Sequence, residues 1–179
     1  IAFLQKNTQM RKKYFAKVIS EGIDLIDSDK VALRDAKRNY ISHIFLLRSR
    51  LLYDGGYYSL ALLELNQIEG SALQGYQGDQ YFSSATNEIE YWYRLARVKS
   101  KLDYSEDILI ENYKKVLEFK RDNSYYVPMS ALQIALIYEK RNNVREAEYF
   151  YNQCLSISGF DYERGIHQKA RAGLDRILD

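Results

Sequence analysis

The chain of 179 residues is long enough for one domain with a hydrophobic core. Apolar residues make up 46% and charged residues 28%, and a net charge of +2 is too small to require a nucleic-acid or membrane partner. The single cysteine, Cys154, excludes an intrachain disulfide framework. No apolar run reaches the roughly 20 residues of a membrane-spanning helix.

The residue pattern predicts an all-α protein. One proline and nine glycines leave few places where a helix must stop, and sustained alternation of polar and apolar residues is lacking. Apolar residues recur instead with helical spacing in the ranges 8–26, 30–53, 57–68, 87–102, 105–119, 128–141, 144–158 and 162–178. Short turns are expected at Gly55-Gly56, at 102–104 and at Asn142-Asn143, which predicts antiparallel helical neighbours.

A helix-pair pattern recurs along the chain. The clearest copy is Ala131-x2-Ile134-Ala135-x2-Tyr138 followed by Ala147-x3-Tyr151-x2-Cys154. Small residues recur at the equivalent positions Ser49 and Ala96, and Ala61 matches Ala147. A small residue in mid-helix lets the partner helix approach closely, so we expect Ser49, Ala61, Ala96, Ala135 and Ala147 to be buried between paired helices.

This pattern resembles the tetratricopeptide repeat, whose helix pairs stack with a period of ~34 residues. The resemblance implies a right-handed α–α superhelix, and it predicts that 1–179 form a single helical-repeat domain. Its repeats are expected at 37–68, 87–119 and 128–158, followed by a C-terminal helix at 162–178. The interval of 47 residues from Ser49 to Ala96 is longer than one repeat, and a Gly- and Gln-rich stretch at 69–84 is therefore interpreted as an insertion.

The chain begins Ile1-Ala2-Phe3-Leu4, without methionine and within a helical pattern. Its layout is similar to the C-terminal half of bacterial tetratricopeptide proteins, so we expect a C-terminal fragment of a longer bacterial helical-repeat protein. Cytoplasmic and periplasmic locations both stay open at this stage.

Few residues have the chemistry or spacing of a catalytic or metal site. Cys154 and His167 are the one combination that could form a thiol nucleophile and its base, but Cys154 falls on a repeat position that takes a small buried residue. The two histidines are far apart and lack the spacing of zinc ligands. We therefore expect no enzyme, no cofactor and no metal site.

The first helix of each tetratricopeptide pair lines the concave face of the superhelix, and the resemblance assigns partner contacts there. The side chains expected in this groove are His43, Arg50, Tyr53, Tyr93, Arg97, Lys101 and Lys140, with Glu90 tempering their charge. Arginine binds carboxylates through two parallel hydrogen bonds and tyrosine packs apolar stems, so we expect an acidic or C-terminal-carboxylate peptide.

The leading hypothesis is thus a non-catalytic scaffold that holds a peptide or protein segment in its concave groove. A solvated face whose charges bind nothing is the simplest alternative for these residues. The 17 tyrosines leave a single-stranded nucleic-acid binder as a second hypothesis, through base stacking. A structural module that assembles with itself is the third.

Overall fold

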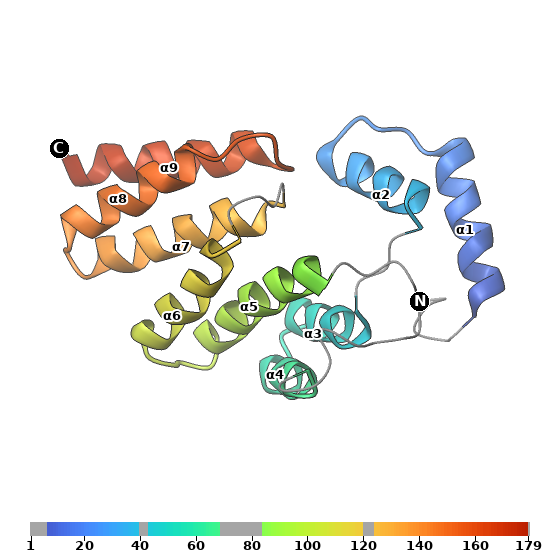
Figure 1. Ribbon diagram of the computed structural model, residues 1–179, viewed down its shortest axis with the longest axis horizontal. Coiled ribbons are helices and arrows are strands. Elements are labelled where there is room, and N and C mark those ends of the chain that lie inside the picture. Colours follow the sequence, from blue (N-terminus) through green and yellow to red (C-terminus); the bar gives the residue numbers. More distant parts are fainter. Residues whose placement is uncertain (1–6, 40–42, 69–83, 120–123, 179) are drawn as a thin grey trace.

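The computed structural model describes residues 7–39, 43–68, 84–119 and 124–178, and within these ranges it consists of helices and turns without a strand (Figure 1). The all-α prediction is confirmed. The insertion predicted at 69–84 lies outside the described residues except for Ser84, which begins a helix. The helices are α1 (Thr8–Glu21), α2 (Asp27–Lys37), α3 (Ile44–Asp54), α4 (Tyr58–Asn66), α5 (Ser84–Ser100), α6 (Glu106–Leu117), α7 (Tyr126–Lys140), α8 (Val144–Leu155) and α9 (Glu163–Leu178).

The prediction of one long helix over 30–53 is wrong, because α2 ends at Lys37 and α3 begins at Ile44. Asn39 adopts the left-handed conformation with φ of 51°, which an α-helix does not allow and which asparagine tolerates better than most residues. His43 then starts α3, and its Nδ1 accepts a hydrogen bond from the backbone N–H of Phe45 at 3.4 Å. A periodic apolar pattern thus runs through a real break between two helices.

The first helix is also shorter than predicted. It begins after Asn7, whose side chain accepts a hydrogen bond from the N–H of Met10 at 2.9 Å, and it ends at Glu21 before the extended Gly22. The helices α1 and α2 pack against each other. Arg34 of α2 forms an ion pair with Asp161 at 2.8 Å, so this first hairpin is tied to the segment that precedes α9 (Figure 1).

The remaining helices pack as the hairpins α3–α4, α5–α6 and α7–α8, and α9 packs on α8 and α7 (Figure 1). Each hairpin turn contains one residue in the left-handed region, namely Gly56, Asp103 and Asn142 with φ of 81°, 55° and 55°. Glycine adopts this conformation without strain, and Asn and Asp adopt it more readily than other residues. The three turns predicted from the sequence are confirmed.

The small repeat positions are closed to solvent. Ser49, Ala61, Ala96, Ala135 and Ala147 are each 0% exposed, as their spacing predicted. The contact at Gly173 of α9 leaves even less space, because a Cβ atom there would clash with the ring of Tyr151 in α8. Close approach of neighbouring helices therefore depends on residues with little or no side chain.

The helix α5 takes part in two hydrophobic clusters. One side of it, with Tyr91, Leu95 and Val98, packs against α3 and α4. Ile89, Tyr93 and Ala96 belong to a second cluster that extends over α6 to α9. Both sets recur at intervals of three or four residues, which places each on one side of the helix. The helix α5 is therefore fixed from two sides, and polar groups at its edge are held in place.

Candidate functional site

A shallow depression lies on the surface between α3 and α5. Its lining residues are Ser49, Arg50 and Tyr53 from α3, and Arg94, Arg97 and Val98 from α5. Within each helix the lining residues include pairs three or four positions apart, such as Ser49 and Tyr53 or Arg94 and Val98, and residues at this spacing share a side of the helix. We call this feature the α3–α5 depression.

The guanidinium group of Arg97 lies over an aromatic ring. Its Cζ atom is 4.3 Å from the ring centre of Tyr53 and 5.7 Å from that of Tyr93. A cation over the face of a tyrosine is attracted by the ring electrons, and the contact also orients the planar group. Stacking occupies the face of a guanidinium and leaves the N–H groups at its edge available to an acceptor. Burial raises the pKa of Tyr93 well above its usual range, so its hydroxyl stays neutral.

About one turn before Arg97 on α5, Arg94 forms a buried ion pair with Glu90. The Glu90 Oε1 atom lies 2.6 Å from Nε and 2.5 Å from Nη2 of Arg94, and the two side chains are only 3% and 7% exposed. Burial alone would lower the pKa of Arg94, but Glu90 together with Tyr126 and Tyr125 more than offsets this effect, and the pKa lies above the usual value. Arg94 also donates to the hydroxyl of Tyr126 at 3.4 Å. The positive charge of Arg94 is thus matched inside the protein.

Two other residues of the depression differ from Arg94, because Arg50 has only a distant carboxylate partner and the Ser49 hydroxyl has none among the described residues. Arg50 lies 3.8 Å from Asp54, one turn along α3, and both side chains are more than half exposed. The hydroxyl of Ser49 is buried and has no hydrogen-bond partner among the residues that the structure describes. A buried hydroxyl without a hydrogen-bond partner costs free energy.

The structure brings together three of the seven residues predicted to contact a partner, namely Arg50, Tyr53 and Arg97. His43 and Tyr93 are 1% and 4% exposed and do not line the depression, so their contact with a partner stays a prediction. His43 is buried at the start of α3, where burial lowers its pKa. Lys101 is exposed beyond the end of α5 and does not line the depression.

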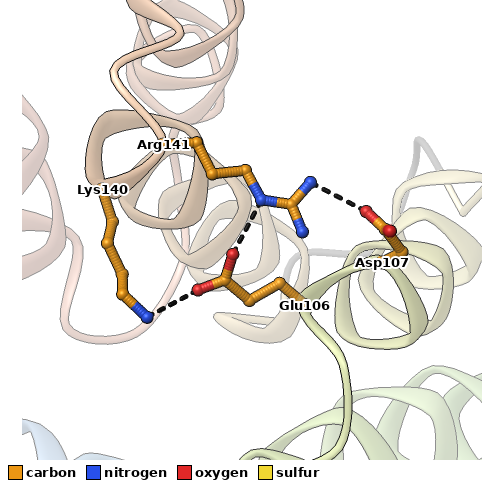
Figure 2. A network of polar contacts seen from close by, with 4 residues as sticks. All are labelled: Glu106, Asp107, Lys140 and Arg141. Carbon is orange, nitrogen blue, oxygen red and sulfur yellow. Dashed lines mark hydrogen bonds and ion pairs between the residues drawn. The ribbon is translucent and has the colours of Figure 1, made fainter.

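The seventh residue, Lys140, belongs to a different part of the molecule. Figure 2 shows Lys140 and Arg141 at the end of α7 reaching toward the start of α6. Lys140 Nζ and Arg141 Nε each lie 2.7 Å from an oxygen of Glu106, and Arg141 Nη1 lies 2.8 Å from Asp107. Hydrogen bonds from Lys140 and Arg141 hold the pKa of Glu106 below its usual value. Lys140 thus joins two helices, and its charge already has a carboxylate partner.

Sequence reasoning missed Arg94 as a component of this site. The available signal was the spacing of Glu90 and Arg94, because an acidic residue four positions before a basic one is a favourable pair on a helix. The burial of this pair depends on Tyr126 and on the packing of α7 against α5, which no local spacing reveals.

The thiol of Cys154 lies inside the protein. Its residue is completely buried, and burial raises the pKa of the thiol to about 12. Nε2 of His167 lies 2.9 Å from the backbone oxygen of Ile157, so this nitrogen already has a partner.

Within the described ranges, no group of three or more His, Cys, Asp or Glu residues is placed to hold a metal ion. None of the helices described there is long and apolar enough to cross a membrane.

Comparison of the chain with protein-family models, with curated proteins and with solved structures finds no match.

Proposed function

We propose that this chain is a non-catalytic scaffold that binds an acidic segment of a partner protein at the α3–α5 depression. One observation carries the proposal: the guanidinium of Arg97 is held over the ring of Tyr53, while no carboxylate among the described residues forms an ion pair with it. An oriented arginine without a carboxylate partner is suited to bind a carboxylate through two parallel hydrogen bonds.

The architecture that we propose for this scaffold is a right-handed superhelix of the tetratricopeptide type. Three consecutive hairpins, each with at least one completely buried small residue, support it. In such a stack the first helices of neighbouring pairs lie side by side, which agrees with the packing of α3 against α5 and of α5 against α7. A partner segment would then lie across the first helices.

The charge at the depression favours an acidic protein segment over a nucleic acid. Arg94 is neutralised by Glu90 and Arg50 is shared with Asp54, so few positive charges remain for successive phosphates. Binding of a nucleic acid strand draws most of its free energy from several phosphate contacts at once. A protein segment that binds through one or two carboxylates needs fewer positive charges on the protein.

An NMR titration of the isotope-labelled protein tests the proposal. The probe is an acetylated, amidated hexaglutamate peptide, with an oligouridine strand in a parallel titration. We expect the peptide to shift the side-chain Nε–Hε signal of Arg97 and the backbone signals around Arg50 and Tyr53. The signals of Glu106 and Arg141 serve as an internal control and should stay in place. Shifts with oligouridine alone, or peptide shifts confined to other helices, would contradict the proposal.

A further inference from the structure

We infer that the α3–α5 depression is a subsite for a single carboxylate group, and that it selects this group over a phosphoryl group with Ser49 as a specificity-determining residue. The inference rests on the proposed function and goes further, because it states which anion the depression accepts and how it is recognised.

The first argument is the balance of charge. The depression is lined by three arginines, but the carboxylate of Glu90 lies 2.5 Å from Arg94 and that of Asp54 lies 3.8 Å from Arg50. Arg97 alone has no carboxylate partner among the residues described, which leaves one unmatched positive charge. A carboxylate brings one negative charge, whereas a phosphate monoester brings close to two at neutral pH. The second charge would be repelled by the carboxylates of Glu90 and Asp54.

The second argument is geometric. The face of the Arg97 guanidinium is taken up by the ring of Tyr53 at 4.3 Å, so an anion meets the edge of the group. Two N–H groups at this edge are parallel, and their separation matches the two oxygens of a carboxylate. Because the contact with Tyr53 fixes the plane of the guanidinium, the carboxylate is also held in a defined orientation.

The third argument concerns the hydroxyl of Ser49. The residue lines the depression, is 0% exposed, and its Oγ atom has no hydrogen-bond partner in the described parts of the chain. The side chain of Arg50 is 59% exposed and only weakly held by Asp54, so it can turn outward and admit a ligand oxygen. That oxygen then accepts a hydrogen bond from Ser49, which removes the cost of an unpaired buried group.

A single carboxylate can come from an aspartate or glutamate side chain or from the end of a chain, and the chemistry of recognition is the same. Three small probes separate these sources and the competing anion. N-acetylglycine offers only a chain-end carboxylate. N-acetylglutamate whose α-carboxyl group is converted to an amide offers only a side-chain carboxylate. Blocked O-phosphoserine offers only a phosphoryl group. Each is titrated into the protein at equal ionic strength and followed by NMR.

We expect wild-type protein to bind at least one carboxylate probe more tightly than phosphoserine. Ser49→Ala should weaken carboxylate binding about fivefold through the lost hydrogen bond, and should keep or raise the melting temperature because an unpaired hydroxyl is removed. Arg97→Lys keeps the charge but loses the parallel N–H groups, and should weaken carboxylate binding about tenfold. A merely structural role for Ser49 would change stability and leave the affinity alone.

The inference is overturned if phosphoserine binds as tightly as the carboxylates, or if Ser49→Ala leaves carboxylate affinity unchanged. In either case, retained binding of hexaglutamate peptide around Arg50 and Arg97 would leave the scaffold proposal standing. If hexaglutamate itself does not bind there, the proposed function fails instead.

Discussion

Two regions of this molecule carry basic residues at the edge of packed helices, and they use them differently. At the junction of α6 and α7, Lys140 and Arg141 meet the carboxylates of Glu106 and Asp107 (Figure 2). At the α3–α5 depression, Arg97 meets two tyrosine rings. The first pair of cations joins two helices through carboxylates, whereas Arg97 has no carboxylate partner among the described residues, and we propose it for that reason as the binding group.

The partner that the neighbouring helix offers explains the difference. Glu106 and Asp107 lie in the first turn of α6, and Lys140 lies in the last turn of α7. Both places favour these charges, because a helix has a partial positive charge at its start and a partial negative charge at its end. Arg97 also lies in the last turn of its helix, α5, but it packs beside Tyr53 of another helix, so aromatic rings surround it in place of carboxylates.

The largest expected effect on stability is at the buried ion pair of Glu90 and Arg94. Glu90→Ala leaves the charge of Arg94 buried without its partner, and should lower the free energy of unfolding by about 3–5 kcal/mol. Urea denaturation measures this change. The double variant Glu90→Leu with Arg94→Met, which removes both charges, should recover most of the loss. A single variant as stable as the parent would mean that the pair does not support the depression.

A smaller effect on stability is expected at the close helix contact around Ala135 in α7. Ala135→Leu puts three extra carbon atoms into a fully closed contact in α7 and should cost about 1–3 kcal/mol of stability by overpacking. The neighbouring Leu136 is 38% exposed and provides the control, because Leu136→Ala removes atoms from a partly solvated position. Thermal unfolding of the two variants compares them. Equal melting temperatures would show that Ala135 is not a close-contact residue.

The pH dependence of stability separates the two regions further. The folded-state pKa of Glu106 is lowered by Lys140 and Arg141, so its stabilisation is complete above the ordinary glutamate value of 4.5 and is lost as the pH falls through the lower folded value. Solvent screens this exposed network, and Glu106→Gln should therefore remove less than about 1 kcal/mol at neutral pH. Urea denaturation from pH 7 downward should show a weaker acid dependence for the variant. An unchanged acid dependence would contradict this role of Glu106.

The smallest effects should come from the arginines of the depression. Arg50→Ala removes an exposed pair and should change stability by less than about 0.5 kcal/mol. Arg97→Ala removes the contact with Tyr53 and should cost about 0.5–1 kcal/mol. Parallel urea denaturation of both variants compares these changes. A cost for Arg50 larger than that for Arg97 would show that the tyrosine contact does not hold the guanidinium.

The sequence predicted those features that follow from local spacing. The five small residues and the meeting of Arg50, Tyr53 and Arg97 both follow from helical periodicity, since residues at equivalent positions of successive pairs share a side. The break near Asn39 was missed because an apolar pattern does not record a left-handed residue. The pairing of Lys140 was missed because its partner, Glu106, is 34 residues earlier and on another helix.

The most direct measurement is the affinity of fluorescent hexaglutamate peptide for two double variants that lose the same charge. The double variant Arg50→Ala with Arg97→Ala removes two cations from the α3–α5 depression. The double variant Lys140→Ala with Arg141→Ala removes the paired cations of the α6–α7 junction. Fluorescence anisotropy at ~0.15 M salt, where exposed charges beyond ~8 Å are screened, compares both with wild type. The account predicts a loss of about tenfold or more for the first variant and less than about twofold for the second. Equal weakening by both variants would mean that net charge, and not the oriented arginine, attracts the peptide.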